Sequence, residues 1–69
     1  MIDRVLANNL RQERKKRKLT QLQLANMTGI ERKTIIYYET CKHAANLNTI
    51  ETIAAALHLS VIDLLTERG

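Results

Sequence analysis

The sequence predicts an all-α protein, a compact bundle of five short helices that forms a single domain over residues 1–69. Three observations lead to this fold class. There is no Pro and there are only two Gly, and no hairpin turn dipeptide lies between alternating strands. Hydrophobic residues make up 45% of the chain, mainly Leu, Ile and Ala. They recur at helical spacing, which excludes a β architecture.

The first two helices are marked by apolar spacing and by their end signals. The apolar residues near the start predict a helix over about residues 3–17, with a basic end that suits the helix dipole. Thr20 is followed three residues later by Gln23, a capping box that begins a second helix. That helix ends at Thr28, because Gly29 readily adopts the left-handed conformation that terminates helices.

The remaining three helices follow the same rules. A third helix, with Ile35 and Tyr38 on one face, runs to about Glu39. Residues 40–46 have no apolar periodicity and are expected to form a loop closed by Asn46 as an N-cap. A fourth helix begins at Leu47, and its apolar stripe breaks near His58. Ser60 caps a last helix that carries the apolar residues Val61, Leu64 and Leu65.

Composition excludes several functional classes. Cys41 cannot close an intramolecular disulfide, and His43 and His58 do not supply a zinc ligand set, so we expect no metal and no cofactor. Cys41 is expected at the surface, with redox sensing as the alternative. The longest apolar run, residues 53–57, is too short for a signal or membrane segment. We therefore expect a cytoplasmic protein with no membrane contact.

The charge is distributed unevenly along the chain. Residues 1–42 carry ten Lys or Arg and four Asp or Glu, a net charge of +6, whereas residues 43–69 carry a net charge of −2. The basic part is suited to a polyanionic partner. A chain this short also buries little of its surface on folding, so we expect a dimer.

Residues 20–39 combine the features of a helix-turn-helix. Two helices that meet steeply need a small residue where their axes approach, a Gly at the turn and buried apolar residues on the second helix. These needs are met in order by Ala25, Gly29, Ile30, Ile35 and Tyr38. With the cap at Thr20, the spacing predicts a helix-turn-helix.

From about Leu10 to Leu65 the chain resembles the Cro and phage-repressor type of helix-turn-helix domain. The resemblance is carried by Leu10, Arg14, Leu19-Thr20-Gln21, Leu24-Ala25, Thr28-Gly29-Ile30, Thr34-Ile35, Tyr38-Glu39, Lys42 and the apolar positions from Leu47 to Ser60. It implies a lambda-repressor-like bundle that places its third helix in the major groove of double-stranded DNA, usually as a two-fold dimer. Such domains are common in bacterial and phage regulators, restriction-modification controller proteins and antitoxins.

The resemblance also implies roles for individual residues. The base-facing positions are Arg32, Lys33, Ile36 and Tyr37. Arg and Lys can donate to guanine O6 and N7, and Ile can contact a thymine methyl group. The phosphate-contacting positions are Thr20, Gln21, Thr40, Lys42 and His43. Gln21 also braces the recognition helix, Arg14 and Glu39 form an architectural ion pair, and Tyr38 packs inward.

Six of the eight residues from Arg11 to Lys18 are Lys or Arg. Only some of them can share one helical face, and from this run we expect Arg11 and Arg17 as phosphate contacts. The alternative is that the run is simply a solvated face that raises the local positive potential.

The chain departs from the family pattern at five positions. Glu31 replaces a capping Ser or Thr, Cys41 replaces a Gly, and both ends of the third helix are expected to differ. The other departures are Glu13 at an apolar position, Ala45 in place of Pro and Ile36 in place of a small polar residue.

These observations predict a sequence-specific DNA-binding transcriptional regulator, a homodimer on a pseudo-palindromic operator, paired through Val61, Leu64 and Leu65. The alternative is a protein-interaction module, such as an antitoxin that binds a toxin and autoregulates its operon, suggested by the apolar residues Leu22 and Ile36 and by the C-terminal leucines, Leu64 and Leu65. An enzyme is not expected, because no nucleophile with a base, carboxylate pair, phosphate loop or metal motif is present.

Overall fold

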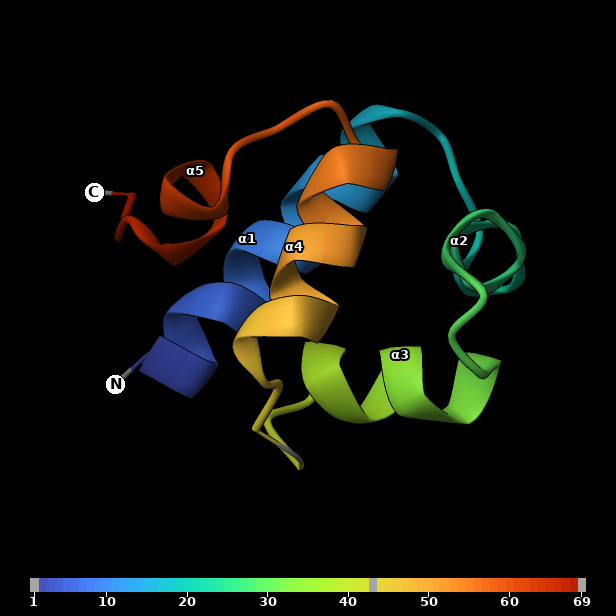
Figure 1. Ribbon diagram of the computed structural model, residues 1–69, viewed down its shortest axis with the longest axis horizontal. Helices are drawn as coiled ribbons and strands as arrows, with labels where there is room; N and C mark the ends of the chain where they lie inside the picture. Colours follow the sequence, from blue (N-terminus) through green and yellow to red (C-terminus); the bar gives the residue numbers. More distant parts are fainter. Residues whose placement is uncertain (1, 43, 69) are drawn as a thin grey trace.

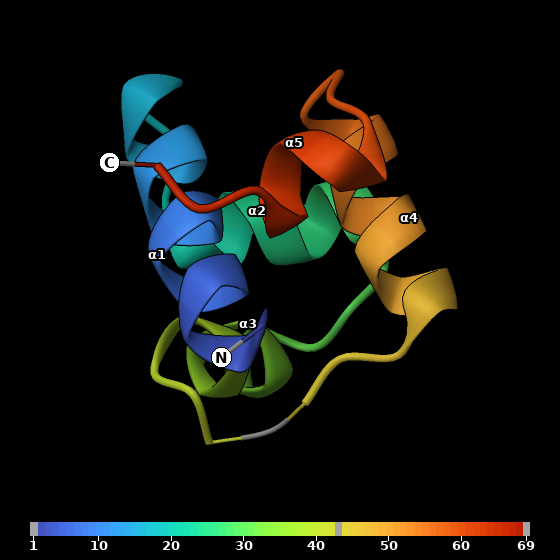
Figure 2. The same cartoon turned by 90° about the vertical axis from the view of Figure 1, so that its left-hand side faces the viewer.

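A computed structural model of the protein describes residues 2–42 and 44–68, and in this part of the chain all regular structure is helical. The helices are α1 (Ile2–Lys16), α2 (Gln21–Thr28), α3 (Arg32–Glu39), α4 (Leu47–Ala56) and α5 (Val61–Leu65). The predicted all-α class and the predicted order of helices are confirmed. Figures 1 and 2 show short helices wrapped around a common centre, with α3 along one edge and α5 at the opposite edge.

Local hydrogen bonds explain where α2 begins and ends. The Thr20 hydroxyl accepts from the Gln23 backbone N–H at 3.0 Å, and the Thr20 N–H donates to the Gln23 side chain at 2.8 Å. At the other end Gly29 has a φ of 73° and donates its N–H to the carbonyl of Ala25. The predicted capping box and the predicted glycine stop are both confirmed.

The caps of α4 and α5 are also formed. The Asn46 side chain accepts from the Thr49 N–H at 2.8 Å. Ser60 and Asp63 form a second capping box, in which the Ser60 hydroxyl accepts from the Asp63 N–H and the Asp63 carboxylate accepts from the Ser60 N–H. Each cap satisfies amide groups that the first turn of a helix leaves without a partner.

Three other helix ends place a residue with a Cβ in the left-handed conformation: Lys18, Cys41 and His58, with φ between 57° and 61°. After Cys41, the N–H of Lys42 donates to the carbonyl of Tyr37 at 2.8 Å, the bond of a Schellman motif. Cys41 thus takes the backbone conformation expected of glycine, and α3 still ends there. The start of α3 differs from the family pattern as expected, because the N-cap residue Glu31 makes no side-chain capping hydrogen bond.

The five helices close into a ring around one core. α1 packs against α3, α3 against α2, α2 against α4, α4 against α5, and α5 returns to α1. The core consists of Leu6, Leu10, Leu24, Ala25, Ile35, Ile50, Ile53, Ala54, Leu57 and Leu64. Because α3 lies at an edge of this ring, its inner side contributes to the core while its outer side stays available.

The expectation for Leu64 is wrong. We expected Leu64 at a dimer surface, but its side chain is fully buried in the core. In a helix, residue 62 lies almost opposite residue 64, so burial of Leu64 turns Ile62 outward. Ile62 is 74% exposed, whereas Val61 and Leu65 pack partly against the core. The exposed apolar side chain of α5 is therefore Ile62.

Candidate nucleic-acid interface

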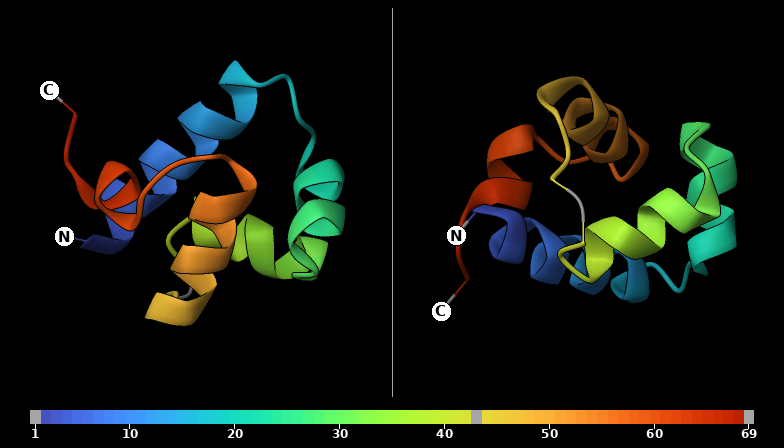
Figure 3. Two further views of the ribbon diagram at one scale, coloured as in Figure 1. Left: turned by 45° about the horizontal axis from the view of Figure 1, so that its top comes forward. Right: turned by 90° about the horizontal axis from the view of Figure 1, so that it is seen from below.

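The recognition helix has two distinct sides. Figure 3 shows α3 from below, nearest the viewer, with α1 along one side of it and α4 on the other. Its inner side holds Ile35 and Glu39, which are 0% and 2% exposed. Tyr38 packs against the core. The side chains of Arg32 and Lys33 are exposed, and those of Ile36 and Tyr37 are half-buried. The four predicted base-contact residues therefore lie away from the core.

Three basic side chains around α3 are not engaged elsewhere. Within the part of the chain that the structure describes, Arg32, Lys33 and Lys42 make no hydrogen bond or ion pair through their side chains, and all three are exposed. An unpaired surface cation keeps its full capacity to attract an anion. These cations are therefore ready to meet a polyanionic partner.

A buried network holds α3 in its orientation. Arg14 in α1 donates to the Glu39 carboxylate through Nε at 2.6 Å and Nη2 at 3.0 Å. Gln21, the first residue of α2, donates from Nε2 to the same carboxylate at 3.2 Å. Arg14 also donates to the carbonyl of Leu19 at 2.8 Å. Since this bidentate contact fixes the planes of both groups, three helices are aligned by one carboxylate.

Three of the predicted phosphate-contact residues lie at the end of α3. Arg11 donates to the carbonyl of Glu39 at 3.1 Å, and Gln21 donates to the Glu39 side chain. The Thr40 hydroxyl donates to the carbonyl of Ile36 at 2.8 Å. The structure thus brings these three side chains to one end of the recognition helix, whereas the Thr20 hydroxyl caps α2 by accepting from the Gln23 N–H. His43, a further predicted phosphate contact, lies outside the described residues.

Arg17, the remaining predicted phosphate contact, lies elsewhere and is already engaged. Its guanidinium donates to the carbonyl and carboxylate of Glu13 and, at 2.7 Å, to the carbonyl of Leu57 at the end of α4. A phosphate contact from Arg17 would have to use its remaining donor capacity or replace these partners.

Glu13 is the centre of a second buried ionic cluster. It is 5% exposed and accepts from both Arg17, which directly follows α1, and Arg68, which lies in the segment after α5. The hydrogen bond from Arg17 lowers the pKa of the Glu13 carboxyl, burial opposes this effect, and the hydrogen bond from Arg68 reinforces it. A carboxylate therefore occupies the position where the family pattern has an apolar residue, and it ties the segment after α5 to α1.

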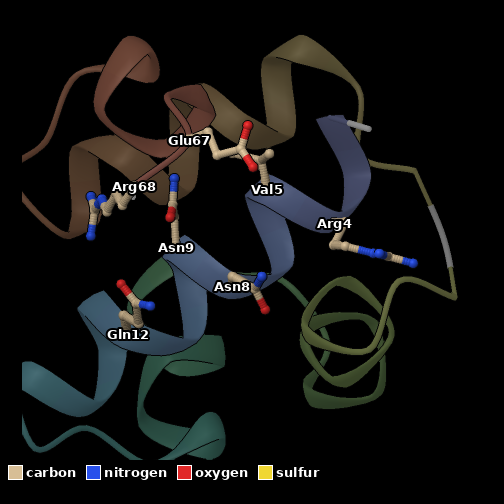
Figure 4. A pocket seen from close by; sticks show the side chains of 7 residues that line it. All are labelled: Arg4, Val5, Asn8, Asn9, Gln12, Glu67 and Arg68. Atoms are coloured by element: carbon tan, nitrogen blue, oxygen red, sulfur yellow. The ribbon is translucent and has the colours of Figure 1, made fainter.

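Asn9 reinforces the same connection. Its Nδ2 donates to the carbonyls of Leu64 at 2.9 Å and Thr66 at 2.8 Å. Figure 4 shows the hollow beside it, between the first half of α1 and the segment that holds Glu67 and Arg68. Neither Asn9 nor Arg68 was singled out from the sequence, because their partners lie more than fifty residues away along the chain.

Comparison with known proteins agrees with this geometry. The model of the family described as helix-turn-helix matches residues 10–64, most of the chain. The chain belongs to the helix-turn-helix family. It is 38% identical over 68 residues to the control protein C.SmaI of Serratia marcescens, a match covering 99% of this chain and 81% of that protein.

A solved structure resembles this helix-turn-helix protein closely. It is the crystal structure of the hypothetical transcription factor NHTF from Neisseria, with a TM-score of 0.94 and 31% identity, covering 97% of this chain and 77% of that one. The protein is a helix-turn-helix transcriptional regulator that binds DNA. No helix in the described ranges is long and apolar enough to cross a membrane.

Proposed function

We propose that the protein is a sequence-specific transcriptional regulator that binds a pseudo-palindromic operator as a homodimer, with α3 in the major groove. The observation that supports this best is that Arg32 and Lys33, on the outer side of a helix whose inner side is held by Glu39, make no side-chain hydrogen bond or ion pair with any other described residue. A rigidly held helix with free donors is suited to reading base edges.

Each of the four proposed base-contact residues of α3 then has a chemical role. Arg32 and Lys33 donate to guanine O6 and N7, Ile36 contacts a thymine methyl group, and Tyr37 contributes its hydroxyl or its ring. The proposed phosphate contacts are Thr20, Gln21, Thr40, Lys42, His43, Arg11 and Arg17. Phosphate contacts position the helix, and base contacts supply specificity.

The dimer is proposed to form through α5. Ile62 is the most exposed large apolar side chain described, at 74%, and Val61 and Leu65 lie beside it, half-buried. In Figure 1 α5 lies at the left, whereas the outer side of α3 faces downward, so a two-fold axis beside α5 leaves both recognition helices on one face of the pair. In such a dimer the two recognition helices enter the major groove about one helical turn apart, roughly 34–36 Å.

Selection of bound sequences from a random duplex library tests this proposal. We expect an inverted repeat when selection is done at about 150–200 mM salt, where nonspecific electrostatic binding is suppressed. Protein that is folded by circular dichroism but enriches no sequence would contradict it.

Two variants then test the division of roles. Arg32→Ala should cost about 1–3 kcal/mol and relax the preference at one base pair. Lys42→Ala should weaken binding to all duplexes alike and reduce the salt slope by about one. Equal losses by both variants on the selected and the scrambled duplex would contradict the assigned roles.

The exposed side chains of α2 favour a second candidate, a protein partner. Leu22 and Met27 are 54% and 51% exposed. Such a surface suits an antitoxin-like complex with the product of a neighbouring gene. Co-expression of that product followed by gel filtration tests it: a stable complex that Leu22→Gln weakens supports this candidate, and two separate peaks contradict it.

A further inference from the structure

We propose that Glu31 is a specificity-determining residue, which together with Lys33 reads a C·G base pair in the operator. Its carboxylate accepts a hydrogen bond from the cytosine N4 amino group, while Lys33 donates to the paired guanine. This inference rests on the proposed function, because it requires α3 to lie in the major groove.

The carboxylate of Glu31 is available for such a contact. Glu31 immediately precedes α3 as its N-cap residue, with φ −61° and ψ 142°, yet its side chain makes no capping hydrogen bond. The side chain is exposed and has no hydrogen bond or ion pair with any other described residue. An acidic N-cap ordinarily accepts from the amides of the first turn. Here that acceptor remains free to meet another donor.

A shallow hollow on α3 brings this acceptor beside a donor. Its lining residues are Glu31, Lys33, Thr34, Tyr37, Tyr38 and Ala44. A carboxylate, an ammonium group and a phenol therefore border one depression that extends from the residue before α3 to the last turn of the recognition helix. The N-terminal residues of a recognition helix are those that contact base edges. A base-pair edge that enters the hollow would meet both a negative acceptor, Glu31, and a positive donor, Lys33, at its border.

The major-groove edge of C·G is complementary to that pair of groups. Cytosine presents the N4 donor and no acceptor, and its paired guanine presents O6 and N7 as acceptors. A carboxylate attracts the N4 group but is repelled by thymine O4, by guanine O6 and N7, and by adenine N7 beside its N6 group. Glu31 therefore favours cytosine by attraction and disfavours each other base by repulsion.

The same carboxylate reduces binding to unrelated DNA. A negative charge near the phosphates opposes nonspecific attraction, which is mainly electrostatic. Only a duplex that offers the N4 donor compensates for that repulsion. Specificity is a difference of affinities, so a repulsive element against the wrong sequences increases it.

Parallel selections from a random duplex library test this inference. The proteins are the wild type, Glu31→Ala and the control Glu67→Ala, which removes the same charge from an exposed side chain in the segment after α5. We expect the wild type and the control to enrich a half-site with a fixed C·G pair, and we expect Glu31→Ala to enrich that pair less strongly, because only Lys33 still reads it. Binding is then measured on the selected duplex with N4-methylcytosine at that position, where the methyl group replaces the N–H that faces the groove.

We expect this methylation to weaken wild-type binding about 10-fold and to leave binding by Glu31→Ala unchanged. The inference is overturned if the wild type ignores the methyl group, or if Glu31→Ala binds every duplex more tightly by one common factor. A wild type that enriches no sequence refutes the proposed function itself. A sharp half-site whose C·G preference is as strong with Glu31→Ala as with the wild type defeats only the role of Glu31.

Discussion

Substitution of Glu39 by Gln should nearly unfold the protein, although the two side chains have almost the same shape. Glu39 is 2% exposed and accepts from Arg14 at 2.6 and 3.0 Å. The neutral amide leaves the guanidinium, which is only 9% exposed, without a counter-ion. If the single oxygen of the new side-chain amide keeps one of the hydrogen bonds from Arg14, the NH2 group of that amide faces another N–H donor and cannot pair with it. Buried groups left in this state carry their full desolvation cost.

The magnitude follows from the burial of both partners. Removing one member of a buried ion pair costs about 3–5 kcal/mol. At about 0.05–0.15 kcal/mol per residue, a domain of this length has roughly 3–10 kcal/mol of total stability. The loss is therefore comparable with the whole stability of the protein. Replacing both partners with apolar residues, as in Arg14→Met with Glu39→Leu, should in contrast be near neutral or stabilising, because no charge remains buried.

Urea unfolding followed by far-ultraviolet circular dichroism measures these differences, since the chain has no Trp. Glu51→Gln is the matched control, because Glu51 is exposed. It should change the free energy of unfolding by less than about 0.5 kcal/mol. The reasoning is refuted if Glu39→Gln costs less than about 1 kcal/mol, or if the double variant is as unstable as the sum of its two single substitutions.

Three further predictions concern the turn, the second ionic cluster and the dimer. Gly29→Ala should cost about 1 kcal/mol in urea unfolding, because φ is 73° but an added Cβ meets nothing within 4 Å. Cys41→Gly should raise the free energy of unfolding by a similar amount, because Cys41 has the same left-handed conformation with a Cβ. A much larger loss with Gly29→Ala would indicate a steric clash instead. The hydrogen bond from Arg17 holds the pKa of the Glu13 carboxyl below its ordinary value of 4.5. The stability that this ion pair gives the fold is therefore fully present above pH 4.5 and is lost as the pH falls through the lowered pKa. Glu13→Gln should therefore destabilise the protein at pH 7, and its free energy of unfolding should fall less on acidification than that of the wild type. The same fall in the free energy of unfolding for both proteins would contradict this. Ile62→Glu should abolish dimers in analytical ultracentrifugation while the far-ultraviolet circular dichroism spectrum stays that of the wild type, since the side chain is 74% exposed and is not part of the core. A persisting dimer would place the interface elsewhere.

The helix boundaries could be predicted from the sequence because their causes are local. The caps at Thr20, Asn46 and Ser60 each involve an amide three residues further along the chain. The stop at Gly29 depends on the backbone freedom of one residue. Interactions over so short a separation need no knowledge of the tertiary fold, so side-chain type alone is sufficient to predict them.

The side of α3 that faces outward could also be predicted from the sequence, because the apolar spacing of Ile35 and Tyr38 identifies the inner side. Leu64 shows the limit of that reasoning. Apolar character says that a residue avoids water, but not whether its own core or a partner chain covers it. The closing of α5 onto α1 made Leu64 a core residue and left Ile62 exposed.

Only the tertiary structure decided which basic residues are free. Arg14, Arg17 and Arg32 have the same guanidinium group, yet Arg14 and Arg17 are held by carboxylates, whereas Arg32 has no such partner among the residues that the structure describes. Those partners are brought by the ring of helices, as in the contact of Arg68 with Glu13 across 55 residues. The sequence by itself determined the helices and the total charge of the basic segment. Folding determined where that charge is neutralised, because a distant acceptor becomes a neighbour only when the chain has packed.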